Sequence, residues 1–404
     1  MKREEILLRA YSKQINWIEA AEVLGMSCRH LRRVRWAYEK YGFDGLHDNR
    51  VGKESPRRMP IAVVEEVLEL YREKYFDLNV RHFHEKLVEK HGMELSYTWV
   101  KALLQGAGLV AKERTRKKHR RRRERKAIAG MMLHIDGSHH RWFGDERWHD
   151  LIVILDDANS EIYYAALAEA ESTASVMKAI RQVVERQGVF CSLYSDRASH
   201  FFLTPKAGEP VDRQSLTQVG RALRDLSIRL IPAYSPQARG RSERSFRTWQ
   251  GRLPQELRLR GITDLEEANR FLKRTYIREF NRKFAVQAAE PDASAFVPCS
   301  RRDELDRIFS IQTERTVNRD NTVKYNNMTL QIEQQRWRSS MDGCRVIVYQ
   351  HLNGTITIGF GPQEIGRYTA DGRALKRSAS RASDLQPKRL AAPVTNRQTG
   401  HLMC

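Results

Sequence analysis

The chain lacks the features of a membrane or secreted protein. Its 404 residues contain no run of about 18 apolar residues, so the sequence predicts no membrane-spanning helix. The N-terminal segment MKREEILLRAYSK is charged and has no apolar stretch, so we expect no signal peptide. The five cysteines lie far apart without a CxxC pair, which argues against disulfides and against a zinc site. These absences favour a cytosolic protein with reduced thiols.

Positive charge is abundant and unevenly distributed. The formal net charge is +21, which is typical of proteins that bind a polyanion, most often nucleic acid. Residues 112–126 hold eleven Lys and Arg against two Glu, whereas residues 131–200 hold six against eleven Asp and Glu. An acidic block inside a basic chain is the composition expected of a cation-binding site, although chance clustering would look the same.

Residues 1–50 carry the pattern of a helix-turn-helix. In NWIEAAEVLGMSCRHLRRVRWAYEKYG, a helix, a glycine-containing turn and a second helix follow one another, and Ser27 is placed to cap the second. The apolar positions of that helix face a core, while Arg29, Arg32 and Arg33 face elsewhere and are candidate DNA contacts. A small helical bundle of another kind would fit the same pattern.

Residues 56–110 repeat this organisation after the break PRRMP. Helices are expected over 61–75, 80–91 and 96–106, with Ser96 as a cap and Lys101 on an exposed face. A basic linker follows at 111–127. A run of like charge is usually only solvated, but the neighbouring modules favour a segment that tracks phosphates. Its candidate DNA contacts are Arg120, Arg121, Arg122 and Arg123.

The pattern after residue 128 completes a multidomain α+β chain. Within 128–285, strands are expected at 131–136, 151–156, 162–167, 189–196 and 227–232, with helices at 172–187, 215–226 and about 240–260. This order predicts a mixed α/β sheet flanked by helices. The alternating residues around Asn353-Gly354 predict a small β-barrel at 305–370, and the polar tail at 371–404 is expected to be disordered.

Three carboxylates are candidates for one metal site. Asp136 and Asp196 each end a predicted strand, and adjacent strand ends form the crevices where ligands bind. Glu243 stands near the start of the last helix, about 75° from the centre of its apolar stripe, and is expected at the edge of the buried face. Because three acids repel one another, their convergence requires a hard divalent cation such as Mg²⁺. Nearby arginines would then hold phosphate: Arg239, Arg241 and Arg244.

Each acid also has a simpler interpretation. A strand-end aspartate is often only a turn former, and Asp156 and Asp157 fit that role best. Glu209, Asp212 and Asp225 compete with Glu243 for the third position, but none of them combines a helix start with surrounding arginines.

The histidines and tryptophans give weaker signals. We expect His134 in the core or at an edge, His139 and His140 in an exposed loop or in contact with DNA, and His200 as a candidate neighbour of the site. Three tryptophans are expected in the core rather than as base-stacking platforms: Trp142, Trp148 and Trp249.

Three segments together resemble a known family of enzymes. HIDGS at 134–138, YSDRASHF at 194–201 and SPQARGRSERSFRTWQGRL at 235–253 resemble DDE transposases with a retroviral-integrase-like catalytic core. The order of modules looks most like bacterial insertion-sequence transposases of the ISNCY group. The resemblance implies an RNase H-like fold and a metal-binding triad of Asp136, Asp196 and Glu243. The last two are 47 residues apart, longer than usual in the family, and the inserted loop at 203–215 accounts for the excess.

The resemblance implies a metal-dependent DNA transposase. Such an enzyme binds the terminal repeats of its element, cuts the 3′ strands and joins them to target DNA, using two Mg²⁺ ions or Mn²⁺ in their place. Double-stranded DNA and further copies of the chain are the implied partners, in the bacterial cytoplasm at the nucleoid. Two alternatives stay open: a catalytically silent or domesticated relative that acts as a sequence-specific DNA-binding regulator, and an RNase H-fold nuclease such as a junction resolvase.

Overall fold

The computed structural model describes residues 3–47, 58–112, 124–203, 211–212, 215–234 and 240–375. The chain divides into two compact units, one made of residues 1–76 and 86–111 and the other of residues 77–85 and 112–404. The expectations for most of the linker, most of the inserted loop and the tail beyond residue 375 fall outside the described residues. None of the helices in the described ranges is long and apolar enough to cross a membrane.

The first unit opens with three short helices. They are α1 (Arg3–Tyr11), α2 (Trp17–Val23) and α3 (Cys28–Tyr41), followed by the 3₁₀ turn η1 (Gly42–Leu46). Ser27 caps α3 as expected, because its Oγ accepts a hydrogen bond from the His30 amide at 3.3 Å. The helices share a small apolar core: Ile6, Leu7, Ala10, Ala20, Ala21 and Leu31. On the outer side of α3, three arginines are exposed: Arg29, Arg32 and Arg33.

Three further helices coincide with the second set of expected helices. They are α4 (Ile61–Glu73), α5 (Val80–His91) and α6 (Tyr97–Gly106). Ser96 caps α6 by accepting from the Trp99 amide at 3.3 Å, and Lys101 is exposed on the same helix. That these helices form a DNA-binding helix-turn-helix stays a prediction.

Residues 77–85 belong to the second unit, where ion pairs hold them. Glu85 accepts two hydrogen bonds from the Arg252 guanidinium, at 2.7 and 2.9 Å, and one from Lys283 at 3.0 Å. His82 and Glu256 form a buried pair at 2.6 Å. Burial alone would raise the pKa of Glu85, but Arg252 and Lys283 outweigh it and hold that pKa at about 2.

A five-stranded mixed sheet organises the second unit. Its strands are β1 (Leu133–His140), β2 (His149–Asp156), β3 (Ile162–Ala168), β4 (Ser192–Ser195) and β5 (Arg229–Pro232), in the spatial order β3-β2-β1-β4-β5. β2 runs antiparallel to β1 and β3, whereas β4 runs parallel to β1 and β5. The mixed sheet predicted from the order of strands and helices is confirmed.

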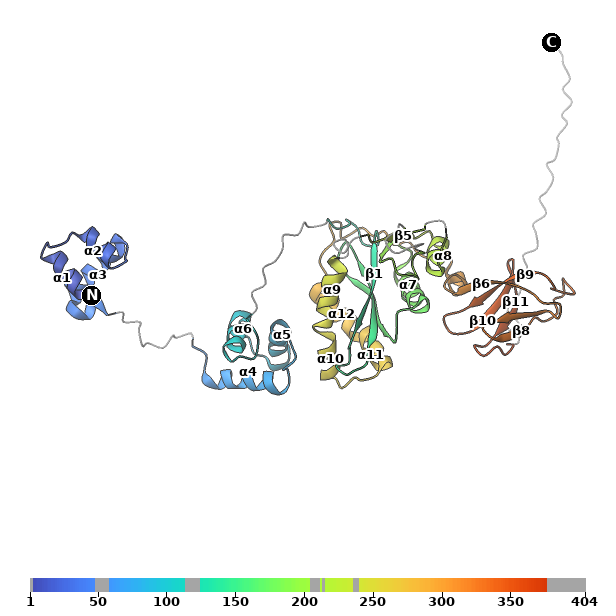
Figure 1. Cartoon of the computed structure of the whole chain (residues 1–404), viewed down its shortest axis with the longest axis horizontal. Helices are drawn as coiled ribbons and strands as arrows, with labels where there is room; N and C mark the ends of the chain where they lie inside the picture. The colour runs from blue at the N-terminus through green and yellow to red at the C-terminus, as the bar shows by residue number, and fades with distance from the viewer. Residues whose placement is uncertain are drawn as a thin grey trace, which may run out of the picture. The chain divides into compact units, whose positions relative to one another are not determined.

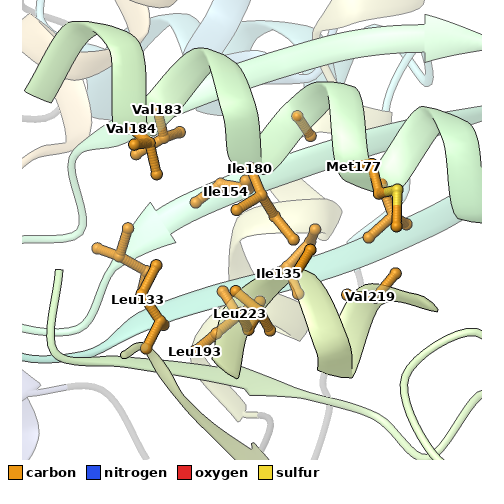
Figure 2. Packing of buried hydrophobic residues seen from close by; sticks show 14 of the residues in the cluster. Leu133, Ile135, Ile154, Met177, Ile180, Val183, Val184, Leu193, Val219 and Leu223 are labelled. Carbon is orange, nitrogen blue, oxygen red and sulfur yellow. The ribbon is translucent and has the colours of Figure 1, made fainter. Parts of the chain in front are cut away.

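One face of this sheet packs against α7 (Thr173–Gln187) and α8 (Gln218–Asp225). Leu133 and Ile135 of β1 lie in one buried cluster with Ile180 of α7 and Leu223 of α8 (Figure 2). Each such side chain contributes about 1.5–3 kcal/mol through burial. Because side chains alternate along a strand, the even-numbered residues of β1 point to the opposite face.

The opposite face is covered by α9 (Gly240–Gln250), α10 (Leu253–Leu259), α11 (Leu265–Phe271) and α12 (Ile277–Phe284). In Figure 1, α9 and α10 lie on the side of the sheet away from α7. Phe246 and Trp249 of α9 lie in one cluster with Leu151 and Val153 of β2. The apolar stripe predicted on this helix therefore does face the sheet.

Two asparagines cover the outer edge of the sheet at β3. Asn269 accepts from the Leu167 amide at 2.7 Å and donates to the Leu167 carbonyl at 2.8 Å, and Asn281 makes the same two bonds with Ile162 at 2.8 and 3.0 Å. A single π-helical turn, η3 (Leu272–Tyr276), lies between them. In a regular α-helix, two residues twelve positions apart point about 120° apart around the axis. The π turn takes up one extra residue, so both asparagines point to the same side of the helix.

The C-terminal strands form two sheets in the described residues, and the closed barrel expected at 305–370 is not seen. After the short helices η4 (Arg302–Glu304) and α13 (Leu305–Ile308) come β6 (Ile311–Thr316), β7 (Thr322–Tyr325), β8 (Met328–Gln331), β9 (Arg345–Gln350), β10 (Ile356–Phe360) and β11 (Gln363–Tyr368). Four of them pair in the order β11-β10-β9-β6, while β7 and β8 pair only with each other. The two sheets share one apolar core, which includes Leu330 and Ile358.

Candidate active site

Asp136 lies in the middle of β1. The expectation from the sequence that it ends this strand is wrong. The strand continues to His140 because it pairs with β2 along its whole length. Residues directly opposite each other in an antiparallel pair point to the same face of a sheet. Asp136 is opposite Val153, which belongs to the core under α9. The Asp136 side chain, 7% exposed, therefore points to the α9 face.

Asp196 follows β4 directly. In the parallel pair of β1 and β4, Tyr194 is opposite His134, and their rings are in contact with centroids 5.0 Å apart. Asp136 and Asp196 each lie two residues beyond this last pair, Asp136 within β1 and Asp196 just after the end of β4. Both acids therefore lie at the same end of the β1–β4 pair, and their catalytic role stays a prediction.

Asp196 also forms a turn, as the simpler interpretation expected. Its Oδ1 accepts a hydrogen bond from the Ala198 amide at 3.0 Å, and the Ala198 carbonyl in turn accepts from the amides of Phe201 and Phe202. The two interpretations are compatible, because the turn fixes the direction in which the chain leaves β4.

Glu243 does not join the two aspartates. It lies in the first turn of α9 with an exposed side chain, whereas Ser242 beside it is buried. The expectation that Glu243 stands at the edge of the buried face is wrong. The stripe that packs on the sheet runs through Ser242, Phe246 and Trp249, which leaves Glu243 roughly 60–120° away around the helix. Within the described residues, no group of three or more His, Cys, Asp or Glu is arranged to hold a metal ion.

A hydrogen bond fixes how α9 lies on β1. Gln250 donates from Nε2 to Ser138 Oγ at 3.0 Å, and Ser138 shares a strand face with Asp136. Glu243 precedes Gln250 by two helical turns, which is about 10 Å along the axis and only about 20° around it. Glu243 therefore lies on the same side of α9 as a residue that contacts β1.

The predicted phosphate-binding arginines are only partly described. Arg239 and the linker residues Arg120, Arg121, Arg122 and Arg123 fall outside the described residues, as does the side chain of Arg241. Arg244 is exposed and donates from Nε to the Gly240 carbonyl at 2.9 Å. No contact described for these residues bears on DNA binding.

Asp156 and Asp157 do more than form a turn, and this role was missed in the sequence. Both are almost fully buried, and Asp156 accepts from the amides of Gly130 and Ala158, each at 2.7 Å. Burial raises the pKa of Asp156, although these two hydrogen bonds favour the charged form and oppose the shift. The available signal was that both acids directly continue the apolar run LIVIL.

Asp157 joins the end of the basic linker to the sheet. Its Oδ2 accepts from the Lys126 amide at 2.9 Å, and its Oδ1 pairs with His134 Nε2 at 2.8 Å. Arg125 donates to the carbonyls of Asp157 and Ala158 and to Ser160 Oγ. We call Asp156 and Asp157 the linker anchor, since they bind the backbone at 126–130.

The structure confirms some of the expectations for the other histidines and tryptophans and contradicts others. His134 is in the core, as expected, whereas His139 and His140 lie within β1 and not in a loop, and their contact with DNA stays a prediction. Trp142 and Trp249 are fully buried, as expected, but Trp148 is 48% exposed and stacks on His139 with ring centroids 4.9 Å apart.

Known proteins with similar sequences are transposases. No protein-family model matches the chain. It is 29% identical over 359 residues to the "Putative transposase y4bF" of Sinorhizobium fredii, covering 89% of this chain and 78% of that one. It is 28% identical to the transposase for insertion sequence IS1202 of Streptococcus pneumoniae, covering 75% of this chain and 72% of that one. The chain is thus a homologue of insertion-sequence transposases over most of its length.

Similar solved structures come from retroviral integration. A simian T-cell lymphotropic virus intasome in complex with the PP2A regulatory subunit B56 gamma matches 70% of this chain and 91% of its own, at 11% identity and a TM-score of 0.32. The dimeric HTLV-2 integrase catalytic core domain in complex with magnesium matches 37% and 90%, at 14% identity and a TM-score of 0.28. With TM-scores this low, the conclusions about this chain rest on its own geometry and on the sequence relatives.

Proposed function

We propose that this chain is a DNA transposase of the DDE type, similar to the ISNCY group, with an RNase H-like catalytic region at 128–285. The observation that supports the proposal is that β1 and β4 are parallel neighbours, with Asp136 and Asp196 each two residues beyond their last pair. The homology to insertion-sequence transposases supports it. Three antiparallel strands followed by two parallel ones, with helices on both faces, suit the RNase H-like assignment.

The donor atoms fit a hard divalent cation. Carboxylate oxygens are the ligands that Mg²⁺ and Mn²⁺ prefer, and acids brought close together repel each other unless a cation lies between them. Asp136 and Asp196 would hold the metal, with Glu243 as the third ligand after a shift of α9. When bound, the metal would supply Lewis acidity at the scissile phosphate.

The proposed reaction has two displacements at phosphorus. Water attacks the phosphate at the end of the element, the bond to the 3′ oxygen breaks, and that oxygen leaves as a free 3′-hydroxyl. The 3′-hydroxyl then attacks a phosphate of the target DNA, which forms a new phosphodiester and releases a 3′-hydroxyl of the target. The arginines near α9, Arg239, Arg241 and Arg244, would bind the phosphates beside the reacting one. No covalent enzyme intermediate is needed, so no Ser or Tyr nucleophile is expected to be essential.

The N-terminal helices and the linker are assigned to DNA binding. The modules at 1–50 and 56–110 would read the terminal repeats through Arg29, Arg32, Arg33 and Lys101, and two ends can be joined only by a multimer. Neutralising the basic residues at 116–125 should weaken binding to every DNA sequence and flatten its salt dependence. Loss of preference for the terminal repeat, with unchanged affinity for other DNA, would contradict this role of the linker.

One experiment tests the catalytic proposal directly. The full chain and its Asp196→Ala variant are incubated with a labelled DNA end and Mg²⁺ or Mn²⁺, and 3′-strand cleavage and DNA binding are measured side by side. We expect cleavage by the wild-type chain only. Equal nicking by both proteins, or no nicking while both bind DNA, would sink the proposal and leave a DNA-binding regulator.

Glu243 needs a test of its own because it is exposed. Glu243→Gln should leave the urea unfolding free energy within about 0.5 kcal/mol of wild type, as surface substitutions usually do. If α9 delivers Glu243 to the metal, cleavage should fall by about 100-fold or more. Cleavage within a factor of three of wild type would remove Glu243 from the site, and Glu209 and Asp212 would be the next acids to substitute.

A further inference from the structure

Asp196 lies just beyond the end of β4, where pairing with a neighbouring strand no longer holds the backbone. β4 ends at Ser195, so Asp196 is the first residue beyond the last β4 pairing with β5, while Asp136 is held within β1 by pairing on β2. Two neighbouring carboxylates repel each other, so the segment after β4 needs an anchor if their spacing is to be constant.

A second pair of side chains lies at this point, on the other face of β1. Glu171, just before α7, accepts a hydrogen bond from His200 Nε2 at 3.0 Å, and both side chains are largely buried. His200 is four residues after Asp196, and its ring packs on Phe201, which is 2% exposed in the core under α7. The Glu171–His200 pair therefore ties the segment after β4 to the beginning of α7.

The Glu171 carboxylate also lies directly against β1. A Cβ added to Gly137 would be 2.2 Å from Glu171 Oε2, so a larger residue at this position must displace the Glu171 carboxylate. The Glu171 amide donates to Asp150 Oδ2 at 2.6 Å, which fixes the same residue to β2. Glu171 thus contacts the residue next to Asp136 and, through His200, holds the segment that begins with Asp196.

We infer that Glu171 and His200 are a positioning pair that sets the spacing between Asp136 and Asp196. The inference rests on the proposed function, since it gives those aspartates a shared cation. The pair touches neither aspartate side chain in the contacts described, and it acts through the backbone of β1 and of the loop after β4. Losing it should widen the spacing and weaken divalent-cation binding, while the apolar core that carries the fold stays intact.

The test uses four variants of the full chain and two measurements. His200→Ala removes the donor, His200→Gln keeps an N–H near the position of Nε2, and Gly137→Ala pushes the Glu171 carboxylate off β1. Glu185→Gln is the matched control, because it breaks the ion pair between Glu185 and Arg181 near the C-terminal end of α7. The Mn²⁺ concentration at half-maximal thermal stabilisation is measured without DNA, and the half-activating Mn²⁺ concentration for DNA-end cleavage is measured separately.

His200→Ala and Gly137→Ala should each raise both Mn²⁺ midpoints by about 10-fold or more, with His200→Gln within about 3-fold of wild type. Glu185→Gln should leave both midpoints unchanged. Unchanged midpoints in His200→Ala and Gly137→Ala, with or without a lower melting temperature, would overturn the positioning role and leave the proposed function standing. A wild-type chain that binds Mn²⁺ but cuts no DNA end would overturn the proposed function, and the thermal midpoints would still decide the positioning role.

Discussion

Two pairs of aspartates in one sheet have opposite surroundings. Asp156 and Asp157, at the end of β2, accept hydrogen bonds from the amides of Gly130, Ala158 and Lys126 and are buried. Asp136 and Asp196 each lie two residues beyond the last pair of β1 with β4. In the sequence all four are acids at or near the end of an apolar strand, and nothing in their immediate neighbours tells them apart.

The difference shows how the hydrogen-bond partners of a carboxylate decide whether it stabilises the fold or remains available for chemistry. Acids whose oxygens already accept bonds from fixed internal amides are committed to the fold, because releasing them would leave buried amides without acceptors. Asp136 and Asp196 lie where β4 ends, and the bond that Asp196 accepts from the Ala198 amide belongs to a local turn. Four predictions test this distinction between structural and proposed metal-binding acids.

Asp136→Asn should have the largest effect, and it should act on chemistry alone. The amide keeps the shape of the side chain but removes the charge, so cleavage of a DNA end should fall by roughly 10³-fold or more. Single-turnover cleavage and urea unfolding, measured on the same preparation, check this. A variant that keeps a tenth of wild-type activity would place Asp136 among the structural acids.

Asp157→Ala should act on the fold alone. It leaves His134 and the Lys126 amide without their buried acceptor, so the free energy of unfolding in urea should fall by about 3–5 kcal/mol. Asp145→Ala, which breaks an exposed pair with Arg147, is the control and should cost at most about 0.5 kcal/mol. Equal losses in the two variants would mean that the linker anchor does not hold the sheet.

Lowering the pH should have opposite effects on the stability contributed by Glu85, which forms ion pairs, and by Asp156, which is buried and accepts backbone hydrogen bonds. The folded-state pKa of Glu85 is about 2, below the ordinary value of 4.5, so its stabilisation is complete above pH 4.5 and is lost as the pH falls toward 2. The pKa of Asp156 is raised, so acidification through its folded pKa favours the folded chain and has the opposite sign.

The measurement is urea unfolding of wild type and Glu85→Gln at pH 7, 5 and 3. Glu85→Gln should cost roughly 1–2 kcal/mol at pH 7, after allowance for solvent screening at this half-buried site, and less at pH 3. A cost that is the same at all three pH values would show that the ion pairs with Arg252 and Lys283 contribute nothing through charge.

Arg125→Ala should have the smallest effect. It removes the hydrogen bonds to the carbonyls of Asp157 and Ala158 and to Ser160 Oγ, at 3.1, 3.2 and 2.8 Å, and should cost about 1 kcal/mol on unfolding. A loss as large as that of Asp157→Ala would shift the anchoring role from the acid to the arginine side chain.

The sequence predicted the order of strands and helices because alternation and helical periodicity are local properties. It misplaced the end of β1, because β2 extends the pairing past Asp136 to His140. It misjudged Glu243, because a rotation of roughly 60–120° about α9 separates its buried positions from this exposed one, and packing on the sheet decides between them. The pairing of Glu171 with His200, 29 residues apart, depends on the fold and leaves no mark in the sequence.

The π turn η3 has a consequence for how the chain can vary. With Asn269 and Asn281 both bound to β3, that edge of the sheet offers no free backbone at Leu167 or Ile162 for another strand to add to, which protects it from aggregation. Deleting one residue within η3 would leave the asparagines eleven positions apart in a regular helix, which places them about 20° apart and still on one side. Such a deletion should therefore be tolerated, whereas inserting one further residue would turn one asparagine about 100° away from β3.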